Sequence, residues 1–283
     1  IKTIKSSSEG SIIVFPELSI TGYPPQDLLL DAVFIAKVEE NLDLIRQNTE
    51  MRIVVVGLPR YSGCELYNSA AIISNGNILG YHDKVLLPTY DVFDENRYFK
   101  PSNRIEPFKV SLDGKSIVLG IQICEDLWDE DYDHNISETL IEKGAEMIIN
   151  ISASPYRKNI ISKRLNLCID KSSHLKYNFI YCNMVGAQDE LVFDGRSFIV
   201  NSSGEVEAMG SAFNEDIIDF DTESLSSIRS NQKAVKQPEE LYMALSLGVG
   251  DYFQKSNFSK AVIGLSGGID SALTAAIATQ AIG

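Results

Sequence analysis

The chain has few cysteines, and no two of them are spaced like metal ligands. The four cysteines, Cys64, Cys124, Cys168 and Cys182, are scattered over 283 residues without a CxxC motif. This spacing makes a zinc or iron–sulfur site improbable, and it does not indicate a disulfide framework.

Basic residues and long apolar runs are also scarce. Lysine and arginine total 25 against 39 aspartates and glutamates, which gives a formal net charge of −14. A chain this acidic is disfavoured as a non-specific nucleic-acid binder. The sequence contains no apolar run of the roughly 20 residues that cross a bilayer, and it does not open with a signal-peptide pattern. We therefore expect a cytoplasmic protein.

The two ends of the chain predict that it is an excerpt of a longer protein. It opens without methionine at "IKTIKSSSEG", a pattern typical of the tail of a polar helix that runs into a strand. It closes just after an apolar helical pattern that has nothing to pack against. We expect a strand of the first domain to precede residue 1.

Segments rich in β-branched residues and bounded by turn residues recur along the chain. They predict strands at 11–16, 52–58, 68–74, 77–82, 116–123, 146–152, 178–183, 196–201 and 205–209. Helical patterns fall at 27–48, 135–143 and 162–176, and Asn75-Gly76 predicts a tight hairpin. Strands joined both by hairpins and by helices predict a mixed sheet covered by helices, in the α/β or layered α+β class.

The pattern changes after residue 223. The polar stretch 224–240 predicts a linker between a first domain, residues 1–223, and a second domain that begins at 241. A helix predicted at 239–255 leads to "KAVIGLSGGIDSALTAAIATQAIG", which is typical of a strand, a loop and a helix in succession.

Several ionisable residues stand where predicted strands end. Cys124 follows the strand at 116–123, Glu17 follows the strand at 11–16, and Lys84 closes a hairpin strand. Singly, each has an ordinary interpretation. A free cysteine is usually a small core residue, and a strand-end carboxylate is usually solvated or caps a helix. The acids that follow Cys124 would raise the pKa of its thiol, so a nucleophilic role needs an activating group elsewhere.

Taken together, these segments resemble the nitrilase, or carbon–nitrogen hydrolase, superfamily, whose members use a Glu–Lys–Cys triad in that chain order. The resemblance covers roughly residues 1–222. It rests on "FPELSITGYPPQDLL", "HDKVLLPTYDVFDENRYF", "QICEDLW", "NISASP" and "NMVGAQDELVFDGRSFIV". These segments look like the glutaminase domain of the glutamine-dependent NAD synthetases. The resemblance implies a layered α-β-β-α fold.

The resemblance also implies a role for each residue of the triad. Cys124 would attack the side-chain amide of glutamine, and Glu17 would take the thiol proton and return it to the leaving ammonia. Lys84 and the backbone N–H of Glu125 would stabilise the oxyanion. Glu95 would orient the lysine. The position of Cys124 between a strand and a turn is what a nucleophile elbow requires.

For the rest of the glutamine molecule, the resemblance suggests contacts from Tyr90 and Ser154. Family members commonly carry a basic residue six positions beyond the serine, where this chain has Ile160. Arg157 or Lys158 would then supply the positive charge for the α-carboxylate.

The string "SGGIDS" between a predicted strand and a predicted helix carries a second kind of chemistry. Glycines permit a positive φ and close backbone approach, and a helix N-terminus adds partial positive charge. The string is not a Walker A loop, and a Gly-Gly turn alone also suits tight strand–helix packing. The whole string resembles the pyrophosphate loop of Rossmann-like ATP pyrophosphatases. This implies ATP contacts by Ser266, Gly267, Gly268, Asp270 and Ser271, with Asp270 near Mg²⁺.

The order of the two domains resembles the family of glutamine-dependent NAD synthetases. That resemblance implies glutamine, ATP and deamido-NAD as substrates, Mg²⁺ as cofactor, and a homo-oligomer. The deamido-NAD site and the rest of the ATP site are expected beyond residue 283.

Three alternatives stay open on the residues alone. The chain could be a stand-alone nitrilase-type amidase that acts on another amide, or a catalytically inactive scaffold with the nitrilase fold. His82, His134 or His174 could also form a papain-like pair with Cys124, although nothing in the sequence places them beside it.

Overall fold

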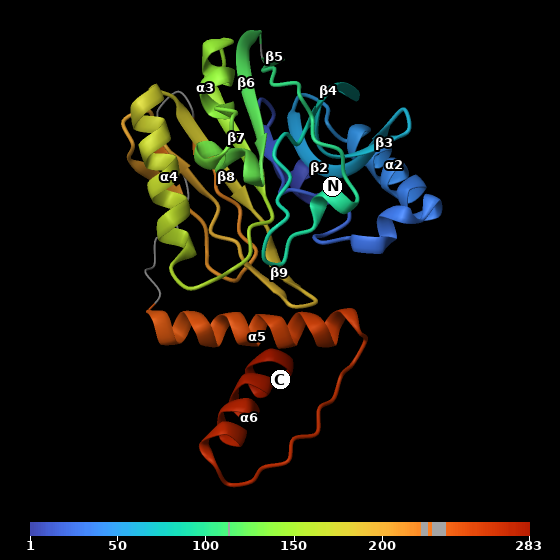
Figure 1. Cartoon of the computed structure of the whole chain (residues 1–283), viewed down its shortest axis with the longest axis vertical. Coiled ribbons are helices and arrows are strands. Elements are labelled where there is room, and N and C mark those ends of the chain that lie inside the picture. The colour runs from blue at the N-terminus through green and yellow to red at the C-terminus, as the bar shows by residue number, and fades with distance from the viewer. Residues whose placement is uncertain (113, 222–225, 228–235) are drawn as a thin grey trace.

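Two β-sheets form the centre of the computed structural model, and helices lie along their outer sides (Figure 1). The structure describes residues 1–112, 114–221, 226–227 and 236–283. Within these residues the first sheet has four strands and the second has six, and two short two-stranded hairpins complete the strands.

The first sheet has the order β1-β2-β3-β4 and is mixed. Its strands are β1 (Ile12–Val14), β2 (Ile53–Ser62), β3 (Glu65–Ser74) and β4 (Asn77–Asp83). β1 runs parallel to β2, and the other pairs are antiparallel. Asn75 and Gly76 join β3 to β4 with φ of +47° and +75°, as a type I′ turn requires. The hairpin predicted from this dipeptide is confirmed.

The second sheet has the order β12-β11-β8-β7-β6-β5. Its strands are β5 (Phe108–Leu112), β6 (Lys115–Ile123), β7 (Met147–Ser152), β8 (Asn178–Asn183), β11 (Phe198–Val200) and β12 (Val206–Met209). The central strands β6, β7 and β8 are parallel, and antiparallel strands flank them. Parallel neighbours need crossover connections, which the helices between these strands provide.

Strand β2 separates two layers of the core, one on each of its faces. Ile53 and Val55 belong to the apolar cluster that the two sheets share. Val54 and Val56 alternate with them and pack in the cluster that includes helix α2 (Ala32–Arg46). Successive side chains of a strand point to opposite faces, so one strand lines both layers.

Helices α3 (Ile136–Glu142) and α4 (Ile160–Leu175) cover the outer face of the second sheet (Figure 1). Their apolar side chains, such as Leu140 and Leu167, pack in one cluster with Phe179 and Phe198 of the sheet. The succession of helix, sheet, sheet and helix confirms the predicted α-β-β-α layering.

The remaining elements are short or lie at the edges of the two layers. They are α1 (Lys2–Ser6), the 3₁₀ turns η1 (Gln26–Leu30), η2 (Glu95–Arg97), η3 (Cys124–Leu127) and η4 (Asp129–Asp131), and the paired strands β9 (Val185–Gln188), β10 (Leu191–Asp194), β13 (Phe220–Asp221) and β14 (Ser226–Ser227).

The continuous helix predicted at 27–48 is wrong in one respect. It is divided at Asp31, whose side chain accepts a hydrogen bond from the Val33 N–H at 2.8 Å and caps α2.

The last two helices lie at one end of the molecule (Figure 1). α5 (Gln237–Lys255) packs on the β9–β10 hairpin, and α6 (Ile269–Ile282) packs against α5. The predicted linker 224–240 overlaps α5 at its end, and residues 224–225 and 228–235 of it lie outside the described residues. None of the described helices has the length and apolar character needed to cross a membrane.

The strand predicted before the glycine loop is wrong. Residues 260–265 form neither strand nor helix and are mostly exposed, with Val262 fully exposed. A strand is stabilised by hydrogen bonds to a neighbouring strand, and in the described part of the chain no strand lies beside this segment.

Candidate active site

A buried lysine between two buried carboxylates forms the centre of the site. The Lys84 Nζ lies 2.8 Å from Glu17 Oε1 and 2.7 Å from Glu95 Oε1. Lys84 is 1% exposed, Glu17 is fully buried and Glu95 is 4% exposed. The structure therefore brings together three of the four residues expected to carry the chemistry. Buried charges are stable only when they are paired in this way.

These three residues lie at one end of the first sheet, where its two outer strands, β1 and β4, both finish. Glu17 follows β1, Lys84 follows β4, and Glu95 opens η2. The Glu17 Oε2 also accepts a hydrogen bond from the Ala153 N–H at 2.8 Å, directly after β7 of the second sheet. The carboxylate of Glu17 thus bridges the two sheets.

Two polar residues that the sequence analysis missed complete this cluster. The Asn68 Nδ2 donates to Glu17 Oε1 at 2.7 Å and more weakly to Glu95 Oε2 at 3.4 Å. The Tyr23 hydroxyl donates to Glu95 Oε1 at 2.9 Å. Tyr23 lies in the quoted segment "TGYPPQDLL", so the resemblance could have signalled it. Asn68 lies inside a predicted strand and has no such signal.

Cys124 comes from the second sheet, where β6 ends and η3 begins. Its φ of +44° lies in the left-handed region, which is uncommon for any residue other than glycine. A sharp, strained turn of this kind exposes a nucleophile at the end of a strand. The predicted elbow conformation of Cys124 is therefore observed.

The electrostatics of Cys124 favour a neutral thiol. Burial raises the pKa of this thiol well above its ordinary value, and the negative charge of Glu17 raises it further. The cation of Lys84 acts in the opposite direction. A thiol held in this state needs a base to remove its proton before it attacks, and Glu17 is the carboxylate with the strongest influence on it.

Lys84 and Glu95 influence each other's pKa. Burial alone would lower the pKa of Lys84, but Glu17 and Glu95 outweigh it and raise that pKa well above the usual value. Burial raises the pKa of Glu95 to about 7, against the opposing attraction of Lys84. Lys84 is therefore a fixed cation, suited to a developing oxyanion.

Tyr90 and Glu125, two of the residues expected to contact substrate, lie together. The Tyr90 hydroxyl lies 3.1 and 3.0 Å from the two carboxylate oxygens of Glu125, and the Tyr132 hydroxyl donates to one of them at 2.9 Å. Tyr90 is 47% exposed, so its ring is open to a ligand. Burial raises the pKa of the Glu125 carboxyl.

Ser154 is held by an arginine that the sequence analysis missed. The fully buried Arg164 donates from Nε to the Ser154 hydroxyl at 3.1 Å, from Nη2 to the Ser154 carbonyl at 2.7 Å, and from Nη1 to Asp194 at 2.7 Å. A signal was available, because Arg164 falls on the apolar face of α4 with Ile160 and Leu167. A charge at such a position predicts a buried partner.

Arg157 and Lys158 are exposed, and the structure does not join them to the cluster. Among the described residues, neither side chain forms a hydrogen bond or ion pair with another expected site residue. The adjacent Asn159 adopts a φ of +65° before α4 begins. Their assignment to the α-carboxylate stays a prediction.

The histidines do not form the papain-like pair considered above. The buried His82 contacts Asp126 through Nε2 at 3.2 Å. His134 and His174 are exposed. Within the described part of the chain, none of the three contacts the Cys124 thiol.

The glycine loop is an open turn at the N-terminus of α6. Gly267 has a φ of +85°, and Gly268 caps the helix. The Ser266 and Ser271 hydroxyls lie 3.1 Å apart, and Ser271 also donates to the Gly268 carbonyl at 3.0 Å. Asp270 lies in the first turn of α6 and is exposed. The structure thus brings all five expected loop residues into one turn.

A glycine lets Glu17 lie directly against β2. A Cβ at Gly57 would lie 2.4 Å from the Leu18 backbone nitrogen and 2.7 Å from the Glu17 Cα. Backbone atoms cannot move away from the added methyl group without a large cost in energy. Gly57→Ala is therefore expected to lower the free energy of unfolding, measured by chemical denaturation, by about 2 kcal/mol. The control is Gly264→Ala, because nothing lies within 4 Å of a Cβ there. Equal unfolding free energies for the two variants would contradict this packing.

The arrangement agrees with comparisons against known proteins. The carbon–nitrogen hydrolase family model matches residues 2–229, and the NAD synthase family model matches residues 241–283. The chain belongs to the carbon–nitrogen hydrolase family. Among its curated relatives, this carbon–nitrogen hydrolase is 40% identical over 300 residues to the glutamine-dependent NAD(+) synthetase of Synechocystis sp., covering 99% of this chain and 53% of that protein.

Two further comparisons concern the same kind of enzyme. The glutamine-dependent NAD(+) synthetase of Aquifex aeolicus is 38% identical over 320 residues, covering 100% of this chain and 55% of that protein. The structure of glutamine-dependent NAD+ synthetase from Acinetobacter baumannii in complex with ADP has a TM-score of 0.89 and 34% identity, and the match covers 100% of this chain and 52% of that chain. This carbon–nitrogen hydrolase chain spans about half the length of these relatives.

Proposed function

We propose that this chain is the glutaminase domain and the start of the synthetase domain of a glutamine-dependent NAD synthetase. One observation carries the proposal. A single chain holds the buried Glu17–Lys84 pair, whose charges act on the Cys124 thiol, and, after residue 240, a glycine loop at a helix N-terminus. The relatives named for glutamine-dependent NAD synthesis match the chain across both parts.

In the first half-reaction, the Cys124 sulfur attacks the amide carbon of glutamine while Glu17 accepts the thiol proton. The resulting oxyanion is stabilised by the Lys84 ammonium and the Glu125 backbone N–H. Collapse of this intermediate breaks the carbon–nitrogen bond, and Glu17 returns the proton so that ammonia leaves. Water, deprotonated by Glu17, then hydrolyses the γ-glutamyl thioester to glutamate and restores the thiol. The buried contacts of Lys84 support its role, because they fix its charge near the reacting atoms.

Substrate recognition is proposed on the exposed side of the cluster. Tyr90 and Glu125 form one wall, and Ser154, ordered by Arg164, forms another. Either Arg157 or Lys158 supplies the positive charge for the α-carboxylate of glutamine. Both are exposed, and among the described residues no hydrogen bond or ion pair holds either side chain, so an incoming carboxylate can reach them.

In the second half-reaction, ATP adenylates the carboxylate of deamido-NAD and releases pyrophosphate. Ammonia then displaces AMP and forms NAD. Backbone N–H groups of the loop from Ser266 to Ser271 and the N-terminus of α6 suit the ATP phosphates. Mg²⁺ is typically held by one or two carboxylates together with substrate phosphates, and Asp270 would supply one such carboxylate.

The test uses the longer protein that this proposal implies, in which the synthetase domain is complete. Glutamate release from glutamine is measured with and without ATP and deamido-NAD. A coupled enzyme releases glutamate faster when both synthetase substrates are present. Glutamate release that does not respond to these substrates would leave a glutaminase without the NAD assignment. Hydrolysis of another amide but not of glutamine would favour the stand-alone amidase. No release from any amide would favour an inactive scaffold.

A further inference from the structure

Asp126 is a fully buried carboxylate that the proposed chemistry does not use. Its Oδ1 accepts hydrogen bonds from the backbone N–H groups of Val85 at 3.0 Å and Leu86 at 2.9 Å. These two residues directly follow Lys84. One oxygen of Asp126 therefore holds the backbone that carries the lysine.

The other oxygen of Asp126 holds the backbone that carries the cysteine. Its Oδ2 accepts from the Ile123 N–H at 3.0 Å and contacts the His82 Nε2 at 3.2 Å. Ile123 directly precedes Cys124. Because a carboxylate can only accept, the His82 Nε2 carries the hydrogen of this bond.

Asp126 thereby joins two segments from different sheets. Lys84 follows β4 of the first sheet, and Cys124 follows β6 of the second. The left-handed backbone of Cys124 is a conformation that persists only when surrounding contacts enforce it. The bond from Ile123 to Asp126 is such a contact, because it closes the turn around the cysteine.

We propose that Asp126 is a positioning residue that sets the Cys124 elbow relative to Lys84, and that His82 supports it. The inference rests on the proposed amide hydrolysis by Cys124. Small displacements of reacting groups strongly reduce rates, so a residue that fixes both segments acts on turnover more than on glutamine binding. Among the hydrogen bonds of the described residues, none joins Asp126 to the Cys124 thiol or to the Lys84 ammonium.

An isosteric substitution separates positioning from space filling. Asp126→Asn keeps the shape but replaces one acceptor oxygen with an NH₂ donor. In either orientation this donor faces an N–H group, from Ile123 and His82 or from Val85 and Leu86. At least one of the two backbone segments therefore loses its hydrogen bond to residue 126.

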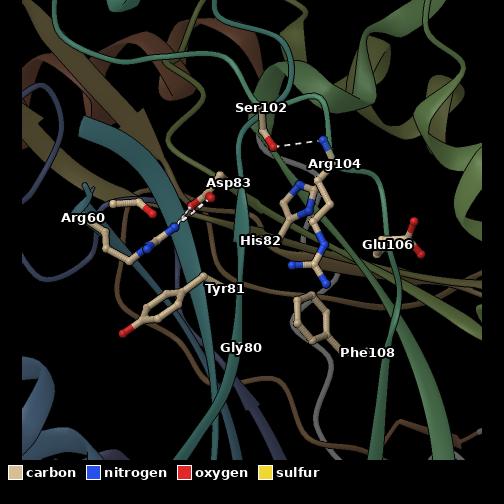
Figure 2. Close-up of a pocket in the computed structure, with 10 residues that line it drawn as sticks. Arg60, Gly80, Tyr81, His82, Asp83, Ser102, Arg104, Glu106 and Phe108 are labelled. Atoms are coloured by element: carbon tan, nitrogen blue, oxygen red, sulfur yellow. Dashed lines mark hydrogen bonds and ion pairs between the residues drawn. The ribbon is translucent and has the colours of Figure 1, made fainter. Parts of the chain in front are cut away.

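His82 allows an independent test, because it contacts Asp126 and also lies beside a cavity. His82 is among the residues that line a cavity of about 350 Å³ between β4 and the segment 102–108 (Figure 2). Arg60 and Asp83, joined at 2.8 Å, form another part of the lining. His82→Gly would extend this cavity to the Asp126 carboxylate. Imidazole, which is smaller than the cavity, can then enter and restore the lost donor.

The experiment measures glutamine hydrolysis by the longer protein, normalised to the amount of Cys124 that iodoacetamide labels. Asp126→Asn is expected to lower kcat about 100-fold with KM nearly unchanged. His82→Gly is expected to lower kcat about tenfold, and added imidazole is expected to recover most of that loss. Asp170→Asn and His134→Gly, both at exposed positions, are the matched controls and should resemble the wild type.

Two kinetic results would overturn the inference. One is a wild-type kcat per labelled site in Asp126→Asn, because any loss would then reflect misfolded protein only. The other is a His82→Gly defect that imidazole leaves unchanged. Crystal structures of wild type and Asp126→Asn give a readout that does not need glutamine hydrolysis. The inference expects the φ of Cys124 or its position relative to Lys84 to change, and identical elbows would refute it. A wild type without glutamine hydrolysis would count against the proposed function, while the two structures would still decide the inference.

Discussion

Cys124→Ala in the longer protein is expected to stop glutamine-dependent NAD synthesis while synthesis from added ammonia continues. The substitution removes the sulfur that attacks the amide but leaves the second half-reaction untouched. Loss of a covalent nucleophile lowers turnover by at least about 10⁴-fold. Alanine is small and fits the buried site, and Cys124 is only 7% exposed, so the fold is expected to persist. NAD formation with each nitrogen donor is the measurement.

The control for this substitution is Cys64→Ala, at an exposed cysteine in the turn between β2 and β3. It should use both donors like the wild type. If Cys124→Ala lost synthesis from ammonia as well, Cys124 would be a structural residue. Unchanged glutamine use by Cys124→Ala would remove the proposed nucleophile altogether.

Asp270→Ala is expected to have the complementary effect. It removes the exposed carboxylate in the first turn of α6, beside the glycine loop. Synthesis of NAD should fall about 100-fold with glutamine and with ammonia alike, because both depend on ATP held at this loop. Glutamine hydrolysis without ATP should persist. The measurement is AMP formation in the presence of deamido-NAD with each donor.

An exposed carboxylate on α5 provides the comparison for Asp270. Glu239→Ala changes charge by the same amount, away from the loop, and should leave AMP formation unchanged. Normal synthesis by Asp270→Ala would contradict the phosphate-loop assignment. A loss confined to the glutamine reaction would mean that Asp270 acts on the first domain instead.

The residues of the central cluster could be predicted because their segments resemble the nitrilase superfamily, whereas their strand-end positions alone left each with an ordinary interpretation. Glu17 and Lys84 stand at the ends of recognisable strands, and the structure joins them at 2.8 Å. The Asn75-Gly76 turn was predictable from its residues alone, since the required φ values select those residue types. The α-β-β-α layering came from the resemblance, because strand periodicity does not reveal how two sheets stack.

The contacts between distant segments could not be predicted in the same way. Arg164 reaches Ser154 and Asp194 from α4, and Asp126 reaches Val85 from another sheet. Such pairings depend on how strands are ordered in space, and neighbouring residues carry no signal of that order. The strand predicted before the glycine loop failed for the converse reason. Its sequence suits a strand, but a strand also needs a partner, and the described residues give it none.

The claim that glutamine bound at Cys124 supplies the nitrogen of NAD has a direct test. The longer protein is given ATP, deamido-NAD, glutamine labelled with ¹⁵N in its amide, and unlabelled ammonium. The ¹⁵N content of the NAD product is then measured by mass spectrometry. The account predicts NAD enriched in ¹⁵N well beyond the share of label in the free ammonia, and no ¹⁵N in NAD from Cys124→Ala. NAD that carries no ¹⁵N when the wild type is used would contradict it.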